Sequence, residues 1–403
     1  MPPWTPAGDR PLRLGVIGLG TRSTLARHVA GQGRPARVVA ICDPAASRRR
    51  RRQQLFRQAR PFASVEAMLE AGGLDGVFLT TPDHSHEELT TRLLAAGVPV
   101  FVEKPLAITT GGCDRILAAA RASGVPLYVG HNMRHLPVMR TMRELVLAGQ
   151  VGEVKAVWCR HFVGHGGDYY FKDWHADRRN TTSLLLQKGA HDIDAIHWLA
   201  GSPSVRVHAM GGLVLYGQIT ARGGQGGKLL EEWNDPGAHW PPGSLTGLND
   251  IVDVEDLSMM TMLLRNGVYA TYQQCHFTPD YWRNYTVIGT HGRLENFGDL
   301  DGAVVKVWNS RRSGHREDAD IVVRVPPRGG GHGGADIPMV AEFIRFLRDG
   351  AATQTSPVAA REAVAAGCAA TESLRAGGVP VDVPPLSADL RDYFSRAPAS
   401  DTS

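Results

Sequence analysis

The first 130 residues alternate between apolar strands and amphipathic helices. Helical spacing marks TRSTLARHVA, SVEAMLEA and HEELTTRLLAAG, each of which lies between two apolar runs. Those runs are LRLGVIGLG (Leu12–Gly20), ARVVAICD (Ala36–Asp43), DGVFLTTP (Asp75–Pro82), VPVFVEKP (Val98–Pro105) and VPLYVGHN (Val125–Asn132). Continuous Val- and Ile-rich strands separated by helices indicate a parallel sheet covered on both faces. The pattern therefore predicts an α/β domain with a doubly wound parallel sheet over residues 1–133.

From about residue 150 the apolar period becomes that of antiparallel strands. GEVKAVWCRHFV alternates, and EDLSMMTMLLRNGVYATYQQCHF (Glu255–Phe277) forms two strands joined at Asn266-Gly267, a strong hairpin signal. YWRNYTVIGTHGRLENFG and AVVKVWNS continue the pattern. We therefore predict an α+β domain with an open, mainly antiparallel sheet over residues 134–350. The C-terminal helices and tail of residues 351–403 should pack back on the core.

Two other segments interrupt this pattern. Gly217–Asp250 is rich in Gly, Pro, Trp and His and is predicted to be a long insertion over one edge; loops of that length are often functional. SRRRRRQQ (Ser47–Gln54) is a run of arginines on a short helix, most simply a solvated face.

Composition narrows the classes of partner. The chain has 403 residues, a formal charge of +4, 43% hydrophobic and 21% charged residues, which gives no case for a nucleic acid or a membrane as partner. Five scattered cysteines without a CxxC argue against a disulfide framework or a structural zinc site. The N-terminus has no apolar core of signal-peptide length, and no run approaches the roughly 20 residues of a membrane span. We expect a cytoplasmic protein.

A dinucleotide fingerprint follows the first strand. GVIGLGTRS places Gly18 at a tight turn and Gly20 where the backbone would approach a pyrophosphate at a helix N-terminus. The alternative is a plain strand–turn–helix. Asp43, at the end of the second strand, would accept ribose hydroxyls and repel a 2′-phosphate, which favours NAD over NADP. Arg48–Arg52 keeps NADP as the less favoured alternative. The predicted cofactor residues here are Gly18, Gly20, Thr21, Arg22 and Asp43.

The chain resembles the Gfo/Idh/MocA oxidoreductases over nearly its whole length. LGVIGLG, CDP, TTPDHSHEE, EKPLA, GHNMRHLPV, GEV, GAHDIDAIHWL and YTVIGTHGRLEN occur in the order expected of that family. The resemblance implies an N-terminal Rossmann domain and NAD(P)-linked chemistry on sugars, polyols and related carbinols. It also implies homo-oligomers, dimers or tetramers, that associate through the C-terminal sheet.

The same resemblance implies roles for individual residues. Lys104 of the EKP element would contact the substrate hydroxyl and the nicotinamide ribose, and His191 matches the catalytic histidine. Many members carry Asp four residues before that histidine, whereas this chain has Gln187; it resembles a subset with Lys188 and Asp192 flanking His191. The remaining residues that the resemblance assigns to the cofactor site are Thr81, Pro82, His86, Glu103, Asn132 and Arg134.

The segment SLLLQKGAHDIDAIHWL (Ser183–Leu199) is predicted to be a helix with a polar face. Lys188, His191 and Asp192 fall at i, i+3 and i+4. Histidine titrates near working pH and suits a base. We expect His191 to face the substrate while Asp194 or Gln187 orients it, and Lys188 and Asp192 to bind sugar hydroxyls or to pair with each other. The simpler interpretations are a buried histidine and a helix-anchoring Asp194.

Two loops are candidates for substrate contact. HFVGHGGDYYFKDWHADRRNTT (161–182) mixes aromatic, basic and acidic residues as sugar sites do, although an ordinary interface loop has a similar composition. His161, His165 and His175 lack a metal-ligand spacing, so no metal is predicted. GGGHGGADIP (329–338) resembles a loop that reaches the active site in sugar-acting members; the alternative is a linker whose Asp336 caps the next helix. The candidates are Tyr170, Lys172, Trp174, His175, Arg178 and His332.

The leading hypothesis is an NAD-dependent dehydrogenase, or a reductase in the reverse direction, acting on a sugar or glycoside-like carbinol. The first alternative is a glycoside-cleaving enzyme in which tightly bound NAD oxidises a ring hydroxyl, permits elimination and is then regenerated. The second alternative is a non-catalytic, NAD-binding sensor. The sequence leaves open the substrate, the oxidised carbon and the oligomeric state.

Overall fold

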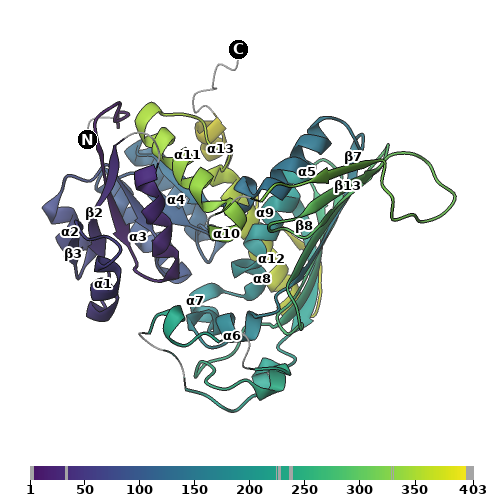
Figure 1. Cartoon of the computed structure of the whole chain (residues 1–403), viewed down its shortest axis with the longest axis horizontal. Coiled ribbons are helices and arrows are strands. Elements are labelled where there is room, and N and C mark those ends of the chain that lie inside the picture. The colour runs from purple at the N-terminus through teal and green to yellow at the C-terminus, as the bar shows by residue number, and fades with distance from the viewer. Residues whose placement is uncertain are drawn as a thin grey trace.

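Two sheets, side by side along the longest axis, form the frame of the computed structural model (Figure 1). The structure describes residues 4–31, 35–223, 225, 228–235, 239–327, 329 and 331–395. Parts of the predicted insertion (224, 226, 227 and 236–238), of the loop at 329–338 (330) and the tail at 396–403 lie outside the described residues. In the described part of the chain, no helix is long and apolar enough to cross a membrane.

The first sheet is parallel, with the strand order β3-β2-β1-β4-β5-β6 of a Rossmann domain. All side chains of β4, β5 and β6 are buried because helices cover both faces. The predicted fold class of this half is confirmed; β3, only three residues long, was not predicted from the sequence. The strands are β1 Leu12–Ile17, β2 Ala36–Cys42, β3 Arg60–Phe62, β4 Gly76–Leu79, β5 Val100–Glu103 and β6 Leu127–Gly130.

Helices complete the first core. The element after the glycine turn, η1 (Thr21–Gly31), is a 3-10 helix. Phe343 of α11 packs its ring 5.2 Å from that of Phe78 and 5.5 Å from that of Phe101, so α11 covers one face of this sheet. It does so from within the range 134–350, and the proposed division of the chain into domains stays a prediction. The helices of this half are α1 Ala46–Gln53, α2 Val65–Ala71, η2 Asp83–Ser85, α3 His86–Ala95, α4 Thr110–Ser123, η3 Asn132–His135 and α11 Asp336–Asp349.

The second sheet has nine strands in the order β14-β13-β12-β11-β7-β10-β9-β8-β15. It is mainly antiparallel, as predicted, with a parallel pair between β7 and β10. The hairpin at Asn266-Gly267 is confirmed, since β9 and β10 pair antiparallel on either side of it. The strands are β7 Val154–Phe162, β8 Ser204–Gly212, β9 Leu257–Leu264, β10 Tyr269–Cys275, β11 Trp282–Gly289, β12 Arg293–Phe297, β13 Val304–Trp308, β14 Ile321–Arg324 and β15 Val381–Asp382.

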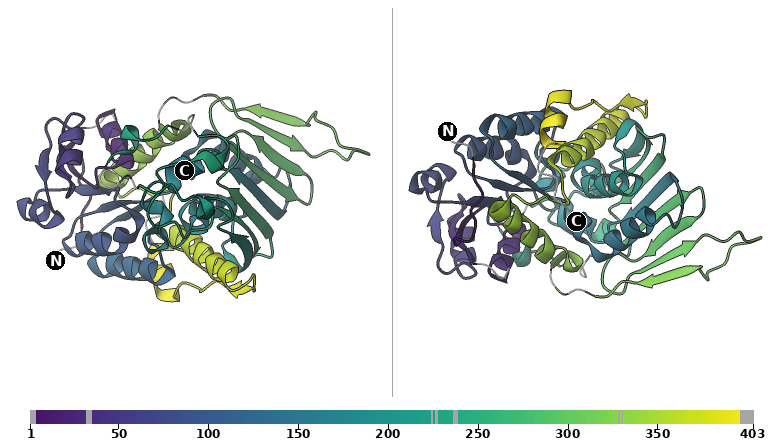
Figure 2. Two further views of the ribbon diagram at one scale, coloured as in Figure 1. Left: turned by 90° about the horizontal axis from the view of Figure 1, so that it is seen from below. Right: turned by 90° about the horizontal axis from the view of Figure 1, so that it is seen from above.

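Helices between the sheets join the two halves (Figure 2). The helix α12 places Ala360 and Val364 in the core of the first sheet, and Ala366 and Ala370 in the core of the second. The remaining helices are α5 Pro137–Leu147, α6 Gly166–Tyr170, η4 Trp174–Ala176, α7 Arg178–Thr181, α8 Leu184–Gln187, α9 Gly189–Ala200, α10 Gly331–Gly334, α12 Pro357–Arg375 and α13 Ala388–Ser395, with short 3-10 turns η5 Tyr216–Gln218, η6 Leu230–Glu232 and η7 Pro242–Ser244.

The predicted helix at 183–199 is two helices, α8 and α9, with Lys188 between them. It begins where Ser183 Oγ accepts a hydrogen bond from the Leu186 amide at 3.0 Å and ends at Gly201, whose φ is +73°. A Cβ on Gly189 would lie 3.1 Å from the Tyr272 ring. The helix therefore lies close against the second sheet at this residue, and Lys188 and His191 line the cavity between the two halves of the chain.

Candidate active site

A cavity of about 960 Å³ lies where the first sheet meets the second half of the chain. It opens at the carboxyl ends of β1, β2, β4 and β5, which is where open α/β sheets bind ligands. Predicted site residues from both halves line it together. They are Gly18, Gly20, Thr21, Arg22, Asp43, Thr81, Pro82, Glu103, Lys104, Asn132, Tyr170, Trp174, His175, Gln187, Lys188, His191 and His332.

The two glycines of the turn differ in their surroundings. Gly18 has a φ of +83°, and a Cβ there would lie 2.6 Å from Thr81 Cγ2 and 2.7 Å from the Thr81 amide nitrogen. A Cβ on Gly20 would meet nothing within 4 Å. Gly18 is thus required by the fold, whereas Gly20 leaves open space at the start of η1, as a bound diphosphate requires.

Asp43 fixes the glycine turn and also faces the cavity. Its Oδ2 accepts from the Leu19 amide at 2.9 Å and its Oδ1 from the Ala45 amide at 2.8 Å. Arg48 Nη1 lies 4.0 Å from Asp43 Oδ2 and also lines the cavity. Each carboxylate oxygen has a second lone pair, so Asp43 can still accept from a ribose hydroxyl.

Lys104 and His191 reach the cavity from opposite sides. Lys104 follows β5, and its Nζ donates to the Gln187 carbonyl at 3.0 Å. Burial, together with Lys104 and Lys188, lowers the pKa of His191 well below its usual value. His191 Nδ1 has no hydrogen-bond partner among the described residues. A neutral imidazole with a free nitrogen beside a lysine can accept a proton.

Lys188 is a second lysine at this end of the cavity. Among the described residues its Nζ makes no hydrogen bond or ion pair, and it lies 5.8 Å from the centre of the Tyr170 ring. Burial, then Arg283 and Lys104, lower its pKa to about 7. It does not pair with Asp192, which was one of the two predicted alternatives.

The prediction that Asp192 binds substrate is wrong. Asp192 is fully buried behind the cavity, where it accepts hydrogen bonds from Tyr285 and His161 and lies 3.1 Å from Arg283 Nε. Although burial acts to raise it, Arg283 and His161 hold the pKa of Asp192 below its usual value. Asp192 therefore anchors the helix to the second sheet and neutralises part of the charge of Arg283, which does line the cavity.

Asp194 was predicted as one of two residues that could orient His191, and Arg134 was predicted to line the cofactor site; neither lies there. They form a buried pair with contacts of 2.8 and 2.7 Å, and His131 Nδ1 is 3.3 Å from the Asp194 carboxylate. Asp194 thus does not contact His191, and Arg134 does not line the cavity. The anchoring alternative for Asp194 fits this geometry, because the pair joins α9 to the turn after β6. Gln187 does line the cavity, but no hydrogen bond to His191 is found there.

Three further predicted contacts are not made with the cavity. The ring nitrogens of the buried His86 lie 2.7 Å from the Pro105 carbonyl and 3.0 Å from the Thr81 carbonyl, so it holds the chain behind the cofactor cleft. Lys172 is buried in a pair with Asp168 at 3.0 Å, and Arg178 is exposed and pairs with Asp253 at 3.0 Å.

Aromatic residues form one wall of the cavity. Trp174 and His175 stack with ring centres 3.7 Å apart, and Tyr170 meets His175 edge-on at 5.1 Å. His175 Nδ1 is buried without a partner among the described residues. Rings that present a face, with a polar atom beside them, suit the C–H and O–H groups of a sugar.

Arg22 and His332 close the cavity between the glycine turn and α11. Arg22 lies 2.6 Å from Glu103 and 3.2 Å from Asp336, and its Nη1 is 2.8 Å from His332 Nδ1. His332 has a φ of +51°, a backbone conformation that is rare outside glycine. The alternative in which Asp336 caps the next helix does not match this geometry: Asp336 is the first residue of α11, and Ala335 before it makes no side-chain cap.

Several lining residues were not identified from the sequence. Asp83 is buried, its Oδ2 has no partner among the described residues, and burial raises its pKa. Arg283 occupies a buried position in β11, and a charged residue within that strand was the sequence feature that could have marked it as a site residue. Segment 228–234 of the insertion reaches the cavity through Lys228, Leu229, Leu230 and Asn234, a segment whose length alone had suggested function.

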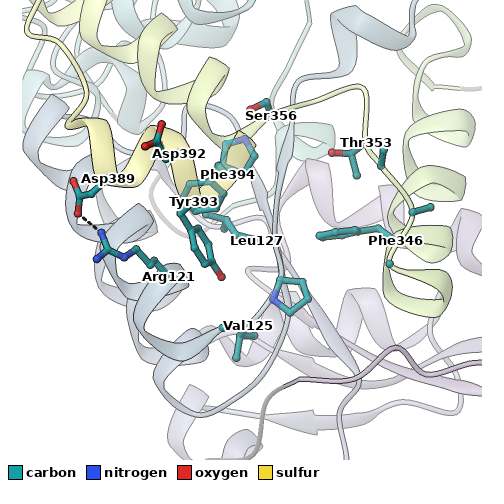
Figure 3. A pocket seen from close by; sticks show the side chains of 16 residues that line it. Arg121, Val125, Leu127, Phe346, Thr353, Ser356, Asp389, Asp392, Tyr393 and Phe394 are labelled. Atoms are coloured by element: carbon teal, nitrogen blue, oxygen red, sulfur yellow. Dashed lines mark hydrogen bonds and ion pairs between the residues drawn. The ribbon is translucent and has the colours of Figure 1, made fainter. Parts of the chain in front are cut away.

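A second cavity, of about 940 Å³, lies at the opposite ends of the first-sheet strands (Figure 3). Val125, Leu127 and Phe346 line it together with Tyr393 and Phe394 of α13. Its charged groups include the ion pair between Arg121 and Asp389 at the rim. Without convergent groups such as Lys104 and His191, this cavity is not a candidate for the chemistry.

Two sequence families match the chain. The family described as "Oxidoreductase family, NAD-binding Rossmann fold" matches residues 12–131, and the one described as "GFO/IDH/MocA C-terminal domain" matches residues 139–295. The two matches follow one another; the first covers the whole of the first sheet, and the second covers the second sheet from β7 to β11 and the start of β12.

The individual relatives share a third or less of their aligned residues with this chain. YteT of Bacillus subtilis, an oxidoreductase by name, is 23% identical over 332 residues, which are 71% of this chain and 75% of YteT. Inositol 2-dehydrogenase 1 of Saccharopolyspora erythraea is 33% identical over 204 residues, 49% of this chain and 56% of that protein. The chain therefore spans little more than half the length of the inositol dehydrogenase that it matches.

Solved structures share the fold. The WlbA dehydrogenase from Bordetella pertussis, solved with NADH and UDP-GlcNAcA, has a TM-score of 0.72 and 20% identity, covering 94% of this chain and 100% of WlbA. At this identity the likeness shows the fold alone.

Proposed function

Because this chain belongs to the Gfo/Idh/MocA oxidoreductases, with their NAD-binding Rossmann domain, we propose that it transfers a hydride between NAD and a carbinol of a sugar, polyol or glycoside-like substrate. The observation that carries the proposal is the presence of Lys104 and His191 in one cavity with the glycine turn. The aromatic wall of the same cavity supports a sugar-like substrate.

The residues fit a dinucleotide. A bound nucleotide would meet the open space at Gly20 and the free lone pairs of Asp43. It would also meet Asn132 Oδ1, which has no partner among the described residues. The nicotinamide, when bound, supplies the hydride acceptor. The carboxylate of Asp43 would repel a 2′-phosphate, which favours NAD over NADP. Arg48 beside it could bind such a phosphate, so NADP stays the alternative.

The chain's own residues would move the proton. The Lys104 ammonium would donate to the substrate oxygen and stabilise its negative charge as the C–H bond breaks. Neutral His191 would accept the hydroxyl proton through its ring nitrogen. Arg283 and Lys188 would bind further substrate oxygens, and the stacked Trp174 and His175 would orient the ring.

A second candidate is glycoside cleavage with NAD that is reduced and regenerated within each cycle. Gln187, close to Lys104 and without a carboxylate, favours it, because the amide cannot stabilise an imidazolium as an acid would. A sensor is the less supported candidate, since it needs neither Lys104 nor His191 in the cavity.

A panel of sugars, polyols and glycosides incubated with NAD tests these candidates. Net formation of NADH with an oxidised product supports the dehydrogenase. Cleaved glycoside with no net NADH would establish the second candidate instead. The sensor would be favoured if the protein bound NAD but formed no product on the whole panel, and if Lys104→Ala bound NAD as the wild type does.

A further inference from the structure

Residues 228–235 of the insertion lie at one end of the active-site cavity. Lys228, Leu229, Leu230 and Asn234 line the same cavity as Asp43. In a Rossmann domain the first glycine turn takes the diphosphate and the acid after the second strand takes the adenosine ribose. The cavity walls beyond Asp43 are Pro44 and the start of α2, so this end is where the adenosine half of a dinucleotide would lie.

Polar contacts hold the segment against the first domain. Glu231 pairs with Arg52 of α1 at 3.1 Å, and the same Arg52 Nη2 donates to the Gly20 carbonyl at 3.1 Å. Arg52 therefore connects the glycine turn directly to the insertion. Arg52 belongs to the arginine run that was interpreted as a solvated face, yet it is only 7% exposed.

The segment is locally ordered and partly apolar. Glu232 Oε2 accepts from the Leu229 amide at 2.6 Å, and a 3-10 turn follows from Leu230 to Glu232. Leu229 is only 5% exposed although it lies in an irregular insertion. Two leucines at the end of a cavity that would receive a flat heterocycle provide an apolar surface for its face.

We propose that residues 228–235 cover the adenosine half of the bound dinucleotide and retard its release. Residues 228–235 belong to the insertion between β8 and β9, line the cavity and are tied to α1 by the Arg52–Glu231 pair. A dinucleotide could then leave only after this pair has opened. The inference rests on the nucleotide site of the proposed function, but not on which substrate is oxidised.

The test measures cofactor release without substrate. The full-length protein is loaded with NADH, and the loss of NADH fluorescence is followed after a chase with excess NAD. Glu231→Gln and Leu230→Ser should each accelerate release about tenfold, the change that corresponds to one lost contact of about 1.4 kcal/mol. Arg50→Gln, at an exposed position on the same α1, is the matched control and should leave the rate unchanged.

A second measurement locates the effect on the dinucleotide. Calorimetric binding of ADP-ribose should weaken in Glu231→Gln, whereas binding of nicotinamide mononucleotide should not. The proposal would be overturned if both variants released NADH at the wild-type rate. It would also be overturned if Glu231→Gln lost the same affinity for ADP-ribose as for nicotinamide mononucleotide. Since no turnover is measured, absent dehydrogenase activity would count against the proposed function and leave this result intact.

Discussion

Lys104 is the residue on which the proposed proton chemistry depends most. Its Nζ lies in the cavity and is held by the Gln187 carbonyl at 3.0 Å. Lys104→Met keeps much of the side-chain volume but removes the charge, so we expect kcat/KM to fall by about 10²- to 10⁴-fold. NADH titration by fluorescence should show binding within a few-fold of the wild type. Lys155→Met, at an exposed pair with Glu153, is the control; a loss as large in that variant would point to a general charge effect.

Lys188 should give the protein a measurable pH dependence of stability. Its pKa in the fold is lowered to about 7, mainly by burial, whereas an unfolded lysine titrates near about 10.4. Between these values the unfolded chain binds a proton that the folded chain lacks, so this residue makes stability rise with pH. We expect Lys188→Met to remove a rise of up to about 1.4 kcal/mol per pH unit, measured by urea unfolding from pH 7 to 9. Parallel curves for the two proteins would contradict this.

Which predicted site residues reach the cavity depended on tertiary contacts. Lys104 and His191 follow from motifs, because a strand end and a helix face determine where their side chains go. Asp192 and Asp194 sit on the same short helix, but Arg283 of β11 and Arg134 of the turn after β6 bind them. Those partners are far away in sequence, and spacing on one helix carries no information about them. The sequence could therefore list the polar groups of the helix but not divide them between cavity and core.

At the scale of the element, the two glycines of the first βα turn serve different purposes: Gly18 is needed for folding and Gly20 for cofactor binding. A Cβ on Gly18 would meet the Thr81 backbone and take a positive φ, so Gly18→Ala should destabilise the protein by roughly 1–3 kcal/mol. The methyl group of Gly20→Ala would have free space, so its free energy of unfolding should lie within about 0.5 kcal/mol of the wild-type value. Its new methyl would project where a diphosphate approaches, so NAD should bind at least tenfold more weakly, by calorimetry. Equal stability of the two variants would refute this division.

The buried Arg134–Asp194 pair ties the helix α9 to the turn after β6, in addition to the contacts of Asp192 with the second sheet. Asp194→Asn would leave the guanidinium of Arg134 buried without a full counter-charge, and we expect a loss of about 3–5 kcal/mol in urea unfolding. Replacing both partners, as Arg134→Met with Asp194→Leu, should recover most of that loss. If Asp194 oriented His191 instead, the single variant would shift the pH profile of kcat/KM at unchanged stability.

Elements with a strong period were predicted well, and irregular ones were not. The alternation of β7 and of β9 to β13 and the apolar runs of the first sheet are properties of each segment itself, whereas β8 was not predicted. By contrast, the three-residue β3 exists through its pairing with β2. Segment 228–235 is tied to α1 by the pair of Glu231 with Arg52, a contact that no local pattern in the insertion could indicate.

At the scale of the whole molecule, the cavity exists because the two halves of the chain, each with its own sheet, meet along α12 and α9. The first sheet contributes Lys104 and the nucleotide turn, and the second half contributes His191, Arg283 and the aromatic wall. Neither half carries a complete set of groups. Activity in the proposed function therefore requires both halves to keep their relative position, which α12 provides by packing in both cores.

The face of the second sheet turned away from these helices is the predicted site of self-association. It exposes Trp158 of β7, with 49% of its surface accessible, and the cross-strand neighbours Met210 and Met259, at 58% and 45%. Large apolar side chains gathered on one face are typical of an interface, and a two-fold axis would bring two copies of this face together. We expect light scattering after gel filtration to give a dimer or tetramer, and Met259→Glu to shift it towards monomer. Leu147→Glu, at an exposed leucine on α5, should leave the mass unchanged; a monomeric wild type would refute association through this face.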